Sequence, residues 1–176
     1  MNVVTNIVSS IAMTISAIIA SIALVLTYLS YRQKLKVEHA ERMYNLFLGT
    51  KKDKDIAEFF CLIDYSVNGW YNKGFHKSDY EQIVDNTLIQ FNHIVYLYDQ
   101  KLLTKEEFEQ YRYEIDKIVH NIDVQRYFFN LYHYSQRVGL SFKFDKLLKY
   151  GSMRGIIEQD FFNVKSTNYG EKCLNF

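Results

Sequence analysis

The chain has 176 residues, 48% of them hydrophobic, with 21 basic and 20 acidic side chains. This near-neutral balance argues against a general nucleic-acid-binding protein, which would carry a clear basic excess. The 15 tyrosines and 13 phenylalanines supply enough apolar surface for the core of one domain.

The first charged residue is Arg32, and residues 1–31 contain no Lys, Arg, Asp, Glu or His. An α-helix rises 1.5 Å per residue, so about 20 apolar residues cross the hydrocarbon core of a bilayer. The run from Val3 to Leu29 is longer than this and predicts a transmembrane anchor over residues 1–31. The alternative is a cleaved signal peptide, which would have a basic start and a shorter apolar stretch.

Three basic residues, Arg32, Lys34 and Lys36, follow the apolar run directly. Lys and Arg beside a membrane-spanning helix stay on the cytoplasmic side. We therefore expect a single-pass protein with its N-terminus outside and its C-terminal domain in the cytoplasm. Residues 32–54 hold seven basic and three acidic side chains, an excess that fits contact with anionic membrane lipid. The positive-inside rule alone is the simpler explanation of this excess.

Small residues recur at intervals of three or four along the predicted anchor, which places them on one helical face. They include Ser9, Ala12, Ser16, Ala20, Ala23 and Thr27. Small side chains let two membrane helices approach closely, so this face predicts a seam for a homo-oligomer. The alternative is that small residues are simply common here, since Ser10 and Ala17 lie off the stripe.

The remainder of the chain follows the helical period almost throughout, and it lacks proline. We expect a basic juxtamembrane helix and loop over residues 32–54, a helical bundle over 55–162 and a flexible tail over 163–176. Apolar periodicity predicts helices near residues 56–67, 80–98, 108–122, 124–134, 144–149 and 155–162. The predicted fold class is all-α, with an antiparallel cytoplasmic helical bundle following one transmembrane helix.

Helix starts have their own signals in this sequence. Ser78 followed by Glu81, and Thr104 followed by Glu107, both match the capping box, in which two side chains satisfy exposed backbone N–H groups. Asp123 is predicted to cap the helix that begins at residue 124. Cys61 lies in an apolar run and is expected to be a small core residue.

Motifs for chemistry are scarce. The sequence has no glycine-rich phosphate loop, nucleophile elbow or zinc-type Cys/His spacing, so we expect no cofactor and no metal. Arg126 and His133 stand seven positions apart on one predicted helix. This spacing resembles the Arg-to-His signature of the helical ribonuclease domains called HEPN. The resemblance implies that Arg126 stabilises a phosphate and that His133 acts as an acid–base catalyst, although Tyr127 stands where that family has a polar residue.

Two aromatic groups are candidate contact surfaces. Trp70, Tyr71 and Phe75 lie in a glycine-containing loop and are expected to be exposed, where they would contact a partner protein or the lipid headgroups. The aromatic run 127–134 covers more than one face of its helix. We expect part of this run to meet solvent or another chain.

The layout of the whole chain resembles small bacterial membrane proteins of unknown function, with one N-terminal span, a basic junction and a helical domain. Some of these lie beside phage-defence genes. The resemblance in layout implies a place in the bacterial inner membrane. We expect a non-enzymatic, self-associating protein that binds an unknown protein partner on the cytoplasmic side, as a membrane effector or scaffold. The alternative hypothesis is a membrane-tethered ribonuclease or toxin that uses Arg126 and His133.

Overall fold

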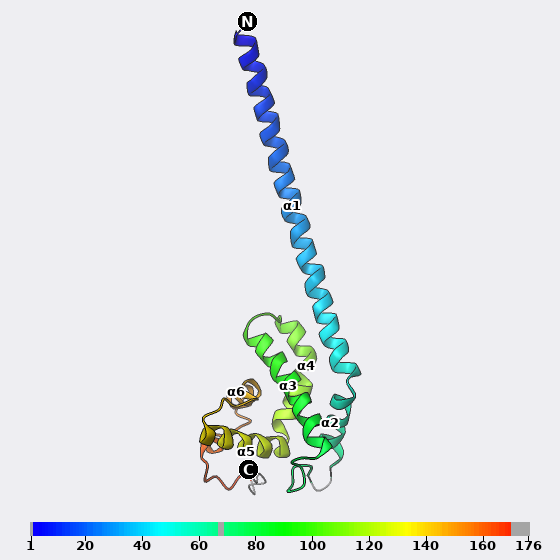
Figure 1. Cartoon of the computed structure of the whole chain (residues 1–176), viewed down its shortest axis with the longest axis vertical. Coiled ribbons are helices and arrows are strands. Elements are labelled where there is room, and N and C mark those ends of the chain that lie inside the picture. The colour runs from blue at the N-terminus through cyan, green and yellow to red at the C-terminus, as the bar shows by residue number, and fades with distance from the viewer. Residues whose placement is uncertain (1, 67–68, 170–176) are drawn as a thin grey trace. The chain divides into compact units, whose positions relative to one another are not determined.

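The computed structural model describes residues 2–66 and 69–169, except for the side chains of residues 2–6, 12 and 51. Within these ranges the regular secondary structure consists of six α-helices and one 3-10 helix, with no β-strand (Figure 1). This confirms the all-α fold class. The chain divides into two compact units, residues 1–49 and residues 50–176.

The first unit is a single continuous helix, α1 (Asn2–Lys52), whose last three residues belong to the second unit. The described side chains from Ile7 to Val37 are exposed. The segment Ile7–Thr50 is long and apolar enough to cross a membrane, and none of its most apolar window is buried. A core helix of a soluble protein would be mostly buried, whereas a signal sequence at the N-terminus can satisfy the same criteria of length and composition.

Three hydroxyl groups within the apolar part of α1 form hydrogen bonds to the backbone of the same helix. Thr14, Ser21 and Thr27 each donate a hydrogen bond of 2.8–2.9 Å to the carbonyl oxygen four residues earlier. An unpaired hydroxyl in hydrocarbon would be costly, and this internal bond removes that cost. These side chains are therefore compatible with an apolar surrounding despite their polarity.

The second unit contains the remaining helices. They are α2 (Lys54–Tyr65), α3 (Asp79–Asp99), α4 (Lys105–His120), α5 (Ile122–Val138), α6 (Asp145–Met153) and the 3-10 helix η1 (Gln159–Phe162). The long helix α3 is central because it packs against α2, α4 and α6 (Figure 1). The helix α4 also contacts α5 and α6, and η1 packs on α5.

The core lies where the apolar faces of these helices meet. On α3 the side chains of Val84, Leu88 and Phe91 are fully buried at intervals of four and three residues, as the helical period predicts. Ile115 and Ile118 of α4 are equally buried. Expected burial of Cys61 is wrong, because its thiol lies on the exposed side of α2.

The predicted capping boxes have different outcomes. At α4 the box is confirmed, since the Thr104 hydroxyl accepts from the Glu107 N–H at 3.2 Å and the Glu107 carboxylate accepts from the Thr104 N–H at 2.8 Å. At α3 the helix does begin after Ser78, but that hydroxyl donates to the Phe75 carbonyl at 2.5 Å and makes no cap. Glu81 accepts from the N–H of Lys77, one residue before Ser78, at 2.7 Å.

The segment after η1 is packed as far as the structure describes it. Tyr169 is buried, and its ring stacks on that of Phe129 with centroids 5.3 Å apart. Asp160 accepts hydrogen bonds from the Ser166 hydroxyl and the Asn168 amide. The segment from residue 163, expected to be a flexible tail, is therefore attached to the helical unit through the ring of Tyr169, while residues 163–165 are exposed. The rest of that expected tail, residues 170–176, lies outside the described residues.

Phe91 offers a test of the core. Its ring is fully buried and meets Phe60 edge-on at 5.8 Å, so Phe91→Ala should lower the free energy of unfolding by about 3–5 kcal/mol. Trp70 is the only tryptophan and is buried, so its fluorescence reports unfolding of this unit. Ile89→Ala is the matched control, because Ile89 lies on the same helix and is 42% exposed. Equal destabilisation by the two substitutions would contradict this assignment of the buried face.

Candidate functional site

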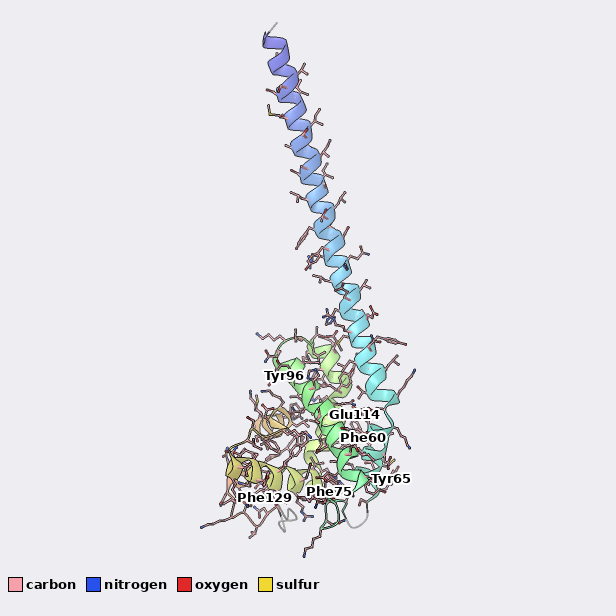
Figure 2. The ribbon with its side chains drawn as sticks, in the orientation of Figure 1. Phe60, Tyr65, Phe75, Tyr96, Glu114 and Phe129 are labelled. Atoms are coloured by element: carbon pink, nitrogen blue, oxygen red, sulfur yellow. The ribbon has the colours of Figure 1, made fainter. Side chains whose placement is uncertain are left out.

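The loop between α2 and α3 folds into an aromatic cluster. Trp70, Tyr71 and Phe75 are only 7%, 6% and 3% exposed. Their rings pack on each other and on Tyr127 of α5, with centroids 5.1 Å apart for Trp70 and Phe75 and 5.4 Å apart for Tyr71 and Tyr127. Figure 2 shows Phe75 where this loop meets the rest of the helical unit. The expected exposure of these three rings is therefore wrong, because they form core.

A buried carboxylate fixes this loop to α5. Asp123 is 4% exposed, and its Oδ2 accepts a 2.7 Å hydrogen bond from the backbone N–H of Trp70. Its Oδ1 lies 3.4 Å from the Arg126 guanidinium. The cap of α5 is instead Asn121, whose Oδ1 accepts from the N–H groups of residues 123 and 124 at 3.0 Å. The predicted capping role of Asp123 is thus wrong, because its carboxylate is engaged by the loop.

Gly69 is required at the point where the loop meets Asp123. Its φ is +77°, a left-handed conformation that side chains disfavour. A Cβ at this position would lie 2.7 Å from Asp123 Oδ2. Both the backbone conformation and the close approach therefore need a residue without a side chain.

Two further hydrogen bonds pair buried polar groups of α5 in the same cluster. The Tyr127 hydroxyl donates to Asp85 at 2.6 Å, and Asp85 is paired in turn with Lys143 at 2.8 Å. Burial, together with the negative charge of Asp85, raises the pKa of Tyr127, so its hydroxyl remains a donor. The Asn130 amide donates to the Tyr71 hydroxyl at 3.1 Å.

The proposed nuclease pair has structural contacts. Arg126 and His133 lie on one face of α5, two turns apart. Arg126 faces Asp123, as above, while His133 Nε2 lies 2.9 Å from the carbonyl oxygen of Phe161 and therefore donates a proton to it. The imidazole also packs edge-on against Phe129, with centroids 4.4 Å apart. The imidazole is half-buried and serves as a donor to the backbone, so the geometry gives no support to a catalytic role.

The aromatic run on α5 is more deeply buried than the sequence predicts. Tyr127, Phe128 and Phe129 are at most 2% exposed. Different elements of the same chain cover them, since Phe128 stacks on Phe144 at 5.3 Å and Phe129 packs on Phe161 at 5.7 Å. A second chain is not needed to bury these three rings.

Exposed aromatic side chains lie elsewhere, on the surface of α2 and α4. Tyr65 is 78% exposed and Tyr113 is 71% exposed. The Lys117 ammonium lies 5.9 Å from the Tyr113 ring and forms an ion pair with Asp64, the residue before Tyr65. Figure 2 labels Tyr65 on the helical unit. The sequence places Tyr113 opposite the apolar face of its helix, so its exposure could have been predicted from the helical period.

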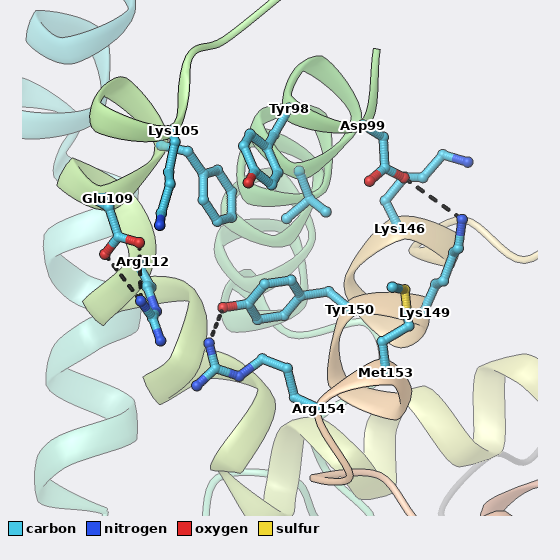
Figure 3. A pocket seen from close by; sticks show the side chains of 12 residues that line it. Tyr98, Asp99, Lys105, Glu109, Arg112, Lys146, Lys149, Tyr150, Met153 and Arg154 are labelled. Carbon is cyan, nitrogen blue, oxygen red and sulfur yellow. Dashed lines mark hydrogen bonds and ion pairs between the residues drawn. The ribbon is translucent and has the colours of Figure 1, made fainter. Parts of the chain in front are cut away.

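A hollow in the second unit lies between α3, α4 and α6, and we call it the α3/α4/α6 pocket (Figure 3). Its volume is about 360 Å³. The apolar wall includes Tyr98 and Phe108, whose rings stack with centroids 4.1 Å apart, and Tyr150, which meets Phe108 edge-on at 6.0 Å. Met153 at the end of α6 is 77% exposed at the mouth.

Charged side chains form the rim of this pocket. Five are basic and two are acidic; they are Lys105, Arg112, Lys146, Lys149, Arg154, Asp99 and Glu109. The described residues contain no group of three or more His, Cys, Asp or Glu side chains that could hold a metal ion. The charge of the pocket therefore suits an anion.

Asp116 contacts three of the side chains that line the pocket. Its Oδ1 accepts from the Tyr150 hydroxyl at 2.7 Å and lies 3.4 Å from Arg154, and its Oδ2 lies 3.7 Å from Arg112. The Tyr150 hydroxyl in turn accepts from Arg154 at 2.9 Å. Burial, reinforced by Asp116, raises the pKa of Tyr150. The sequence analysis missed this pocket because its residues come from three separate helices.

The predicted seam and lipid-contacting residues lie on α1. Ser9, Ser16, Ala20, Ala23 and Thr27 are exposed, and the side chain of Ala12 lies outside the described residues. The basic residues Arg32, Lys34 and Lys36 are also exposed, and Lys34 forms a weak ion pair of 3.8 Å with Glu38. The described side chains of both sets are not covered within their own unit.

The chain matches no protein-family model, no curated protein and no solved structure.

Gly69→Ala tests the attachment of the aromatic loop. Gly139 has a similar φ of +72° but nothing within 4 Å of an added Cβ, so Gly139→Ala measures the backbone cost alone, about 1 kcal/mol. Gly69→Ala should cost about 2–4 kcal/mol, because it also displaces a charge-assisted hydrogen bond to Asp123. Urea unfolding followed by Trp70 fluorescence gives both values. If they are equal, the contact between Gly69 and Asp123 is not limiting.

Proposed function

We propose that this protein is a single-pass membrane protein that self-associates through α1 and presents an antiparallel helical domain to a protein partner in the cytoplasm. One observation carries the proposal: α1 has an uninterrupted, uncharged apolar surface that nothing in its own unit covers. A long apolar surface of this kind is stable in hydrocarbon and unstable in water.

The internal hydrogen bonds of the hydroxyl groups support this location. Thr14, Ser21 and Thr27 carry hydroxyl groups within the apolar segment, and each donates to a backbone carbonyl of the same helix. The exposed cluster Arg32, Lys34 and Lys36 then favours the cytoplasmic side for the remainder of the chain, with anionic lipid beside it.

Self-association is supported by the small side chains on one face of α1. Ser16 and Ala20 lie in the middle of this face, where two helices could approach closely. The Thr27 hydroxyl already has a partner in its own helix, so the contact would rest on close packing at this position.

A protein partner would meet an exposed part of the helical domain. The pair Tyr65 and Tyr113 beside Lys117 is the aromatic surface best suited to this role, because tyrosine contributes apolar area together with a polar group. This surface replaces the buried loop that the sequence suggested.

Cys61 provides a test of location and topology, because its thiol is exposed. In a Cys173→Ser background, a membrane-impermeant maleimide should label Cys61 only after the inner membrane of bacterial cells has been permeabilised. The protein should also resist alkaline carbonate extraction and retain residues 1–31 by mass spectrometry. Labelling in intact spheroplasts would contradict the orientation, and loss of the N-terminal segment would establish a signal peptide.

A double substitution tests the seam. Ser16→Leu with Ala20→Leu keeps the helix apolar but adds bulk where the backbones would meet, so disulfide-independent crosslinking in membranes should shift from oligomer to monomer. The control is Ile15→Leu with Ile19→Leu, which changes shape on another face. Unchanged crosslinking in both double mutants would mean that α1 does not mediate association.

A further inference from the structure

The charge of the α3/α4/α6 pocket differs from that of the unit that contains it. Residues 50–176 carry seventeen basic and eighteen acidic side chains, which is a net charge of −1. The residues that line the pocket carry five basic and two acidic side chains, and Asp116, which contacts Arg112 and Arg154, brings the local net charge from +3 to +2. A local excess of this size in a slightly acidic domain creates a positive potential at one place on its surface.

Three of the cations gather on the same side of the pocket. Figure 3 shows Lys105, Arg112 and the guanidinium of Arg154 on the side toward which the Tyr150 hydroxyl points. Lys105 is the first residue of α4 and Arg154 follows the last residue of α6, so distant parts of the chain supply them. Lys105 forms no ion pair with any described residue.

The two arginines are held in place without using all their donors. One nitrogen of Arg112 contacts both Glu109 oxygens, at 2.9 and 3.1 Å, and Asp116 lies near its Nε. Arg154 uses one terminal nitrogen for both Tyr150 and Asp116. A guanidinium has five N–H donors in a planar fork, so each arginine retains donors for a ligand while its position is fixed.

The apolar wall is suited to a flat ring. Tyr98, Phe108 and Tyr150 present aromatic surface, and the exposed thioether of Met153 is flexible enough to close over a bound group. The volume of about 360 Å³ lies within the range of about 300–1,000 Å³ that is typical of small-molecule sites. It has room for one compact ligand.

We propose that the α3/α4/α6 pocket binds a nucleoside monophosphate. Lys105, Arg112 and Arg154 hold the phosphate, and the base lies against the wall formed by Tyr98, Tyr150 and Met153. A phosphate offers three terminal oxygens to three converging cations, whereas a carboxylate offers only two. None of the residues that line the pocket belongs to α1, so the proposed binding does not require the membrane location or the self-association proposed above.

The binding experiment uses the full chain in nanodiscs of zwitterionic phosphatidylcholine, with AMP, GMP, CMP and UMP titrated separately by calorimetry. At least one nucleotide should bind at micromolar concentration and raise the melting temperature followed by Trp70 fluorescence. Inorganic phosphate and ribose 5-phosphate should bind at least tenfold more weakly, because they lack the base. Equal binding of ribose 5-phosphate, or no binding of any nucleotide, would overturn the proposal.

Variants assign the binding to the pocket. Lys105→Gln and Arg154→Gln should each weaken nucleotide binding by tenfold or more, while Lys73→Gln, an equal charge change at an exposed loop position, should leave it unchanged. Tyr98→Leu should weaken nucleotide binding without affecting the weaker binding of inorganic phosphate. Melting temperatures measured without ligand identify any variant that fails to fold. If one of these variants fails, Lys105→Met takes its place in the binding test, because Lys105 is exposed and its substitution should not disturb folding.

A membrane arm separates the free nucleotide from a lipid headgroup. Nanodiscs that contain phosphatidylglycerol should leave nucleotide affinity unchanged if the pocket takes a soluble ligand. Competition by phosphatidylglycerol that disappears in Arg154→Gln would identify an anionic lipid as the occupant and overturn the nucleotide assignment.

Discussion

The hydrogen bond from the Trp70 backbone to the buried carboxylate of Asp123 joins the loop after α2 to the start of α5. A carboxylate that is 4% exposed is stable only if donors surround it, and here a backbone N–H and a guanidinium serve that purpose. The aromatic rings of the loop then pack against Tyr127. Loss of this attachment would expose Trp70, Tyr71 and Phe75 together and open the core along α5.

The helical unit derives its core from aromatic contacts to an unusual degree. Rings from the α2–α3 loop, from α5, from the α5–α6 connection and from η1 meet in series, mostly edge to face. Each such pair adds about 0.5–1.5 kcal/mol beyond the burial of its surface. Some polar groups in this core have partners, as Tyr127 does with Asp85 and Asn130 does with Tyr71. The buried Trp70 Nε1 and the Thr87 hydroxyl have no hydrogen-bond partner among the described residues.

The two proposals rest on different parts of the chain and on different forces. Location in a membrane depends on the hydrophobic surface of α1, which a single charged substitution in its middle would disturb. Ligand binding at the α3/α4/α6 pocket depends on charge and on fixed donors, which Asp116 positions through Arg112, Tyr150 and Arg154.

The sequence by itself determined the helices, because the spacing of apolar residues is a local property. Helix α3 begins after Ser78, the Thr104 capping box forms, and α1 is uncharged before Arg32, all as the sequence predicts. Only the tertiary structure decided which aromatic residues are buried. Trp70 and Phe75 look exposed in a glycine-containing loop, yet they are core because Asp123, more than forty residues away, accepts the Trp70 N–H. The pocket likewise could not be predicted from the sequence, because Lys105 and Arg154 are brought together only when α4 and α6 pack beside α3. A local pattern records the period of a helix, whereas the meeting of distant side chains depends on how the helices pack.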